Sequence, residues 1–178
     1  YGGTGNGFTK FTGPTTSEKT FTLPDANTTL VGLDTIQTLT NKVIQLNPAP
    51  SDTTYSGETC SFTAGENLTA GQVCYLKSDG KMWLAKSDVM ATSGACIVGM
   101  AMASISANAA GIFLMRGFYQ NATLFNLTPC VPEYISAATS GALTETAPST
   151  TGNIVRIVGY AKTADIIYFC PDNTYLEI

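Results

Sequence analysis

The chain of 178 residues contains no histidine. Histidine is the commonest general base and a common metal ligand, so catalytic sites of the Ser-His-Asp and Cys-His types are excluded. Thirteen acidic residues remain, and most stand in turn-like segments where solvated carboxylates are expected. We therefore predict no enzyme activity, no metal and no cofactor, although counting alone leaves open a glycosidase that uses a pair of carboxylates.

Charge is also scarce, at 12% of residues against roughly a quarter in an average domain. The formal net charge is −4 and there is no basic run, which argues against a nucleic-acid partner. No apolar run approaches the roughly 18 residues of a membrane helix, and there is no signal-peptide pattern. A surface with so little charge can be buried between subunits at small desolvation cost.

Thr, Ser, Asn and Gly take the place of the charged residues, which favours short strands joined by tight turns. We predict an all-β protein in which residues 58–178 form a head domain, a β-sandwich or barrel. Residues 78–81 (Ser-Asp-Gly-Lys) and 151–153 (Thr-Gly-Asn) are hairpin-turn signals. The expected strand segments are 60–63, 72–76, 81–85, 95–102, 111–119, 132–136, 153–160, 165–169 and 174–178.

Residues 1–46 predict a neck that cannot form a core alone. Alternation over 20–31 predicts two short strands around a turn, and residues 34–46 then change period. Ile36, Leu39, Val43 and Leu46 recur at spacings of three, four and three, as in the a and d positions of a heptad. A helix this short is only marginally stable in isolation, and a bundle of three chains would bury its apolar seam. The alternative is that residues 34–46 form a strand that leads into a loop.

Residues 47–57, with two prolines and small polar residues, predict a semi-rigid linker between neck and head. The chain begins with Tyr1 rather than Met, so we expect an unseen upstream region. Five cysteines without a CxxC motif predict buried, reduced thiols that act as small hydrophobes; a disulfide between two of them is the alternative. The cysteines are Cys60, Cys74, Cys96, Cys130 and Cys170.

The first quarter of the chain resembles a module of bacteriophage tail-fibre and related virion proteins. The resemblance is carried by the order TLPD, TTLVG and QTLTNK, at residues 22–25, 28–32 and 37–42. Domains of phage virion proteins are resembled more weakly by residues 68–76, 78–81, 111–118 and 151–160 and by the ending 167–178. The resemblance implies a homotrimer with an N-terminal shaft and a C-terminal head, located in the virion and attached to tail or capsid through the upstream region.

Two functions are consistent with this resemblance. The head of a tail fibre would contact a glycan or protein of the host cell surface, whereas a capsid-attached head fibre or decoration protein would have no receptor. For the first function we expect Trp83, Tyr119 and Asn121 to be contact residues, as exposed aromatic or loop side chains. Arg116 and Arg156 stand inside apolar runs, where they either take the alternate polar positions of a strand or form salt bridges between subunits.

Overall fold

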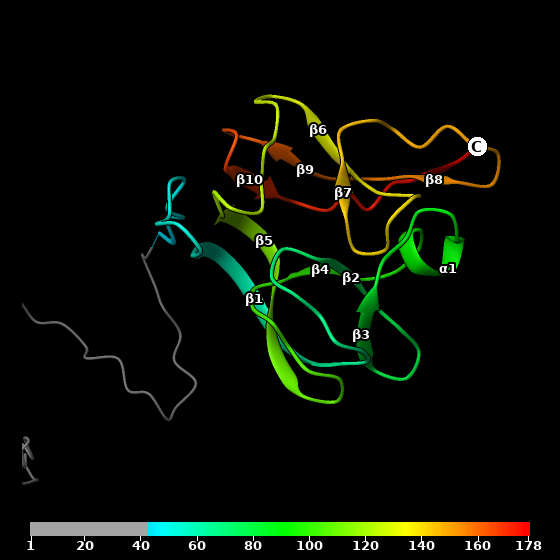
Figure 1. Ribbon diagram of the computed structural model, residues 1–178, viewed down its shortest axis with the longest axis horizontal. Coiled ribbons are helices and arrows are strands. Elements are labelled where there is room, and N and C mark those ends of the chain that lie inside the picture. Colours follow the sequence, from blue (N-terminus) through cyan, green and yellow to red (C-terminus); the bar gives the residue numbers. More distant parts are fainter. Residues whose placement is uncertain (1–42) are drawn as a thin grey trace, which may run out of the picture. The chain divides into compact units, whose positions relative to one another are not determined.

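The computed structural model describes residues 43–178, whose regular secondary structure is mostly β-strand (Figure 1). The predicted strands of 20–31 and the seam residues Ile36 and Leu39 lie outside the described residues. Among the residues that are described, no helix has the length and apolar character needed to cross a membrane.

Every strand segment expected within residues 58–178 overlaps an observed strand. Two short elements were not expected, the helix α1 and the strand β7. The elements are β1 (Tyr55–Ala64), β2 (Val73–Leu76), β3 (Lys81–Leu84), α1 (Met90–Ser93), β4 (Val98–Ala101), β5 (Ala110–Gln120), β6 (Pro132–Ile135), β7 (Leu143–Thr144), β8 (Ile154–Val155), β9 (Ile157–Ala161), β10 (Ile166–Phe169) and β11 (Leu176–Glu177).

Nine of the strands form one mixed sheet that branches at β5. In one branch β5 pairs with β4, β4 with β2, β2 with β3 and β3 with β1, and β1 pairs with β5 again, so these strands form a closed ring of pairings. In the other branch β5 continues into β10, β9, β6 and β7. The β1–β3 pair is parallel and the other pairs of this sheet are antiparallel.

Strand β5 can serve both branches because it is long and its two halves have different partners. Leu114 lies opposite Met100 of β4, whereas residues 117–120 pair with β10. On its other side β5 pairs with β1 along most of its length, and the register of this pair shifts between Glu58 and Thr59. Gly117 has a φ of +148°, and a Cβ there would lie 2.4 Å from the carbonyl oxygen of Ser56, so the close approach of β1 and β5 requires glycine.

The buried hydrophobic side chains of the head form two clusters. The first comes from the ring strands and the loops next to them, and the second joins the ring to strands β6, β9 and β10. The first cluster contains Ala64, Leu68, Cys74, Met82, Ala101, Ile105 and Phe113. The second contains Val73, Ala85, Val98, Met100, Met102, Leu114, Tyr119, Phe125, Ile135, Val158, Ile167 and Phe169.

The ordered head begins before residue 58, because β1 already begins at Tyr55 and the compact unit at Ile44. Asn47 N–H donates to the Ser56 hydroxyl at 2.8 Å, and the Lys162 ammonium donates to the Pro48 carbonyl at 2.7 Å. Residues 47–57 therefore belong to the head. Residues 43–46 have no regular secondary structure, so the part of the predicted seam that is described, with Val43 and Leu46, is not helical.

The turn at residues 78–81 joins β2 and β3 as a hairpin, with Gly80 at a φ of +78°. Residues 151–153 also turn, but they do not form a hairpin because β8 pairs with β11. The five cysteines are free thiols. Cys74 is buried as expected, and its burial raises the pKa of the thiol to about 12. Cys60 and Cys130 are exposed, contrary to the expectation.

Candidate functional site

Trp83, the first residue expected to contact a receptor, is partly exposed on β3 opposite Tyr75 of β2. Its indole N–H donates to the Asp79 carboxylate, at 3.1 Å from Oδ2, and the Lys77 ammonium lies 4.4 Å from the ring centroid. Gly65 packs so closely that a Cβ there would lie 2.1 Å from Cε2 of the indole. The ring already has partners within the chain, so a ligand would have to displace Lys77 to stack on that face.

Tyr119 and Asn121 are buried, with exposed fractions of 1% and 8%, so the expectation that their side chains are exposed is wrong. Tyr119 lies on the inner face of β5 and belongs to the second hydrophobic cluster. Asn121 follows the end of β5, and its Nδ2 donates to the Tyr119 hydroxyl at 2.9 Å. The phenol therefore keeps a hydrogen-bond partner within the core.

These two residues hold the loop of residues 121–127 in place. The Asn121 Oδ1 accepts hydrogen bonds from the backbone N–H groups of Thr123, at 3.2 Å, and Leu124, at 2.9 Å. The Tyr119 ring packs edge-on against Phe125, with 5.6 Å between the ring centroids. Because the Asn121 side chain binds two successive N–H groups, it fixes the backbone shape of the loop. The loop packs on the buried Tyr119 ring through Phe125.

That loop forms one wall of a cleft of about 340 Å³, and residues 69–72 and 139–143 form the others. Thr, Ser, Asn and Gln side chains alternate around the cleft with apolar ones, and none of its lining residues carries a charge. Gln72 is held within its own loop, since its Oε1 accepts from Thr69 N–H at 2.7 Å. Asn126 and Ser140 are exposed at the cleft.

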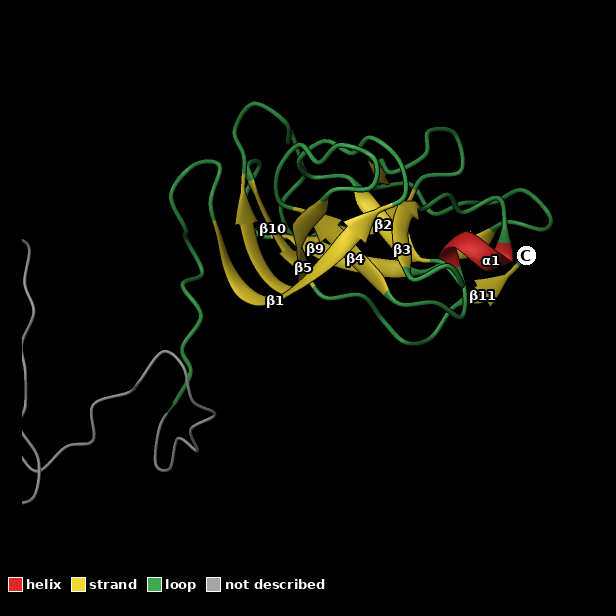
Figure 2. Cartoon of the chain, turned by 90° about the horizontal axis from the view of Figure 1, so that it is seen from below, coloured by secondary structure: helices red, strands yellow, loops and turns green. Residues whose placement is uncertain are grey.

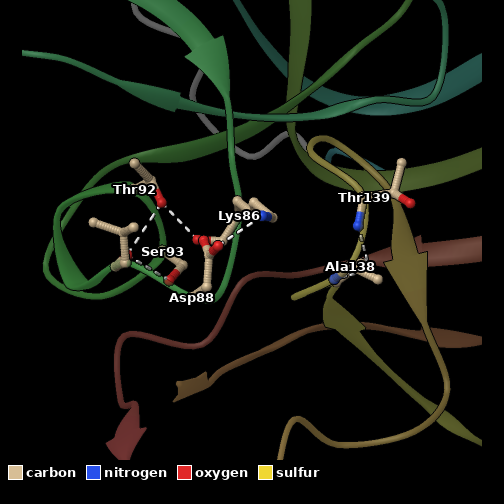
Figure 3. Close-up of polar contacts among 8 residues, drawn as sticks. Lys86, Asp88, Thr92, Ser93, Ala138 and Thr139 are labelled. Atoms are coloured by element: carbon tan, nitrogen blue, oxygen red, sulfur yellow. Dashed lines mark hydrogen bonds and ion pairs between the residues drawn. The ribbon is translucent and has the colours of Figure 1, made fainter. Parts of the chain in front are cut away.

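The third wall is fixed to the core by its backbone. The Ser136 hydroxyl accepts from the N–H groups of Ala138, at 3.1 Å, and Thr139, at 3.2 Å, and both donors are labelled in Figure 3. Gly141 N–H donates to the Ala85 carbonyl at 2.7 Å, and the φ of Gly141 is +75°. A side chain at this position would be strained and would meet Leu84, so glycine keeps this wall close to β3.

Arg156 is a second buried feature, with 5% of its surface exposed. Its Nε donates to the Asp172 carbonyl at 2.7 Å, and its Nη1 donates to the carbonyls of Gly94, at 2.7 Å, and Cys96, at 3.0 Å. Within residues 43–178 the Arg156 guanidinium forms no ion pair with a carboxylate. Backbone carbonyl oxygens are its main hydrogen-bond acceptors there. Arg156 also lines a hollow of about 470 Å³ beside residues 94–98.

The Gly94 and Cys96 carbonyls belong to the segment that follows the short helix α1. The Thr92 hydroxyl donates to the Lys86 carbonyl at 2.5 Å, and the Ser93 hydroxyl donates to the Val89 carbonyl at 3.2 Å. Lys86 and Asp88 form an ion pair at 2.6 Å on the same segment. The four-residue helix is therefore held by side-chain bonds to its flanking backbone, and Arg156 bonds to the carbonyls at its C-terminal end.

Glu133 on β6 is fully buried, and both of its carboxylate oxygens lack a hydrogen-bond partner in the described part of the chain. Burial raises its pKa to about 7, and the charge of nearby Glu145 adds to this rise. Glu145 itself accepts a hydrogen bond from the Thr128 hydroxyl at 2.9 Å. Glu133 is therefore a titratable group of the core rather than part of the cleft lining.

The described residues contain no group of three or more His, Cys, Asp or Glu side chains placed to hold a metal ion. No family model, curated protein or solved structure matches the chain. The site must therefore be interpreted from its own geometry, which is that of a preformed, uncharged cleft between loops on a rigid β-scaffold.

Proposed function

We propose that this chain is a structural component of a bacteriophage virion, a trimeric tail fibre whose barrel-like head contacts the host cell surface. The neck would join three copies through Ile36, Leu39, Val43 and Leu46, and an upstream region would attach the fibre to the tail. The resemblance of residues 22–25, 28–32 and 37–42 to tail-fibre modules supports the placement in a virion.

The observation that carries the contact role is the cleft between residues 69–72, 124–127 and 139–143. Neutral side chains with both donors and acceptors suit the hydroxyl groups of a surface glycan or the backbone of a surface protein. Binding residues are often found on loops held by a rigid scaffold, and each of these loops is held by the side-chain or backbone bonds described above.

A second candidate is a capsid-attached head fibre or decoration protein with no receptor. The burial of Tyr119 and Asn121 favours it, because it removes two of the three side chains expected to reach a receptor. Trp83 also has partners within the chain. The two candidates share the trimeric neck and differ in whether the head binds cells.

The test is binding of the fluorescently labelled full chain to intact bacteria, measured by flow cytometry over a panel of strains. We expect saturable binding to a subset of strains, and a strong reduction in the double variant Asn126→Ala/Ser140→Ala. The matched control is Asn173→Ala, an exposed asparagine of the hollow beside Arg156, which should bind like the wild type. Failure of the wild type to bind any susceptible strain would favour the decoration protein.

A further inference from the structure

Aromatic side chains form a row across the face of the second branch that points away from the core. The pairings place Phe118 of β5 next to Tyr168 of β10, and Tyr168 next to Tyr160 of β9. Paired residues of neighbouring strands project from the same face of a sheet. The residues that alternate with them, Tyr119, Ile167 and Ala161, are buried on the opposite face.

This aromatic row, Phe118–Tyr168–Tyr160, has the geometry of a contact surface. The rings of Phe118 and Tyr168 lie with centroids 4.7 Å apart at an angle of 35°, and 45% of Tyr160 is exposed. Arg116 lies beside the row, and its Nε donates to the Tyr168 hydroxyl at 3.1 Å. Exposed aromatic residues with an adjacent arginine are the composition typical of the centre of a protein interface.

The charges next to the row are balanced. Arg116 lies opposite Glu58 of β1, and both side chains are exposed. A surface of this kind presents an apolar centre with one positive and one negative group beside it, so identical copies can meet without a net repulsive charge. It offers no excess of one sign that would favour a nucleic acid or a charged membrane.

The chain enters the head on this same face. Ser56 lies opposite Phe118 in the register, and Asn47 N–H donates to the Ser56 hydroxyl at 2.8 Å. The Lys162 ammonium, from the turn that follows β9, holds the Pro48 carbonyl at 2.7 Å. The segment that leads into β1 can be followed in Figure 2. The row therefore lies next to the point at which the preceding chain is attached.

We propose that the aromatic row is the surface through which the heads of neighbouring copies meet, an inference that rests on the proposed trimeric fibre. Leu46, the last residue of the predicted seam, directly precedes Asn47, and consecutive Cα atoms are about 3.8 Å apart. In a trimer whose three chains meet just before their heads, the anchored Asn47 of each copy lies close to the three-fold axis. The face that holds Asn47 then points toward the same face of the other copies.

The experiment is sedimentation equilibrium of the full chain over a range of concentrations, on the wild type and three variants. Tyr160→Glu introduces a charge into the proposed interface, and Tyr160→Ser removes the ring without adding a charge. Tyr175→Glu is the matched control, because Tyr175 is exposed to a similar extent, 40%, but lies outside the row. Circular dichroism melting curves show whether each variant is folded.

We expect the wild type to be a trimer and Tyr160→Glu to raise the concentration at which half the chains are trimeric by about tenfold or more. Tyr160→Ser should shift this concentration in the same direction, and Tyr175→Glu should leave it unchanged. A trimeric wild type with both Tyr160 variants unchanged would overturn this inference and leave the proposed function intact. A monomeric wild type at micromolar concentration would overturn both.

Discussion

The amide of Asn121 donates to the buried Tyr119 hydroxyl at 2.9 Å, and through this bond the core of the head supports a wall of the cleft. Both residues were expected at the surface, and both prove to be supports. The exposed side chains of the cleft, such as Asn126, belong to the loop that Asn121 holds. A change at Asn121 therefore acts on the shape of the cleft without removing one of its lining side chains.

We predict that Asn121→Ala lowers the free energy of unfolding by about 1–2 kcal/mol, because the Tyr119 hydroxyl and two loop N–H groups lose their partner. Amide hydrogen exchange of residues 121–127 should become faster, while exchange in β5 stays slow. Asn126→Ala is the control within the same loop, since Asn126 is exposed, and it should leave exchange unchanged. Equal exchange rates in the two variants would contradict the supporting role of Asn121.

Glu133 predicts a dependence of stability on pH. Its pKa in the folded chain is raised from 4.5 to about 7, so the folded state binds the proton more tightly than the unfolded state does. The folded state is therefore penalised progressively as the pH rises from about 4.5 to 7, by about 3 kcal/mol when the carboxyl group is fully ionised. Below this window the carboxyl group is protonated in both states and the penalty disappears.

Glu133→Gln removes this titration. In urea unfolding at fixed protein concentration, the stability of the variant relative to wild type should increase between pH 5 and pH 8. Glu177→Gln replaces an exposed carboxylate and serves as the control for changes in overall charge. A difference between Glu133→Gln and wild type that is constant over this range would contradict the raised pKa.

The buried hydrogen bonds of Arg156 predict that lysine at this position gives a less stable protein than arginine. Lysine keeps the charge but lacks the planar fork that reaches the Asp172 carbonyl and the carbonyls of residues 94 and 96 at once. We expect Arg156→Lys to lower the free energy of unfolding by about 2–4 kcal/mol, because buried carbonyls lose partners. Lys77→Arg exchanges the same two side chains at an exposed position and should stay within about 0.5 kcal/mol of wild type. Equal stability of the two variants would show that the buried bonds of Arg156 contribute little.

The strands could be predicted because alternation and turn residues are local signals. Ser78 to Lys81 predicted the β2–β3 hairpin for this reason, and Gly80 supplies its positive φ. The closed ring could not be predicted, since it depends on a parallel pairing of Thr63 with Lys81 that no local pattern encodes. The helix α1 has only four residues, too few for a helical period to be recognised.

The burial of Tyr119 could not be predicted from the sequence, for a physical reason. Phe118 and Tyr119 are neighbouring aromatic residues on β5, so the sequence pattern is the same whichever of the two faces the core. The structure buries Tyr119 and leaves Phe118 partly exposed in the aromatic row. The cleft itself combines uncharged residues from three separate loops, and such residues leave no periodic signal in the sequence.

The most direct test of the proposed fibre is the molar mass of the full chain, measured by multi-angle light scattering at micromolar concentration. We predict three times the mass of one chain for the wild type, and dissociation when Leu39 and Val43 are both replaced by lysine, because charges in an apolar seam of three chains oppose association. The head of that variant should keep its circular dichroism spectrum. A wild-type mass of a single chain would contradict the trimeric fibre.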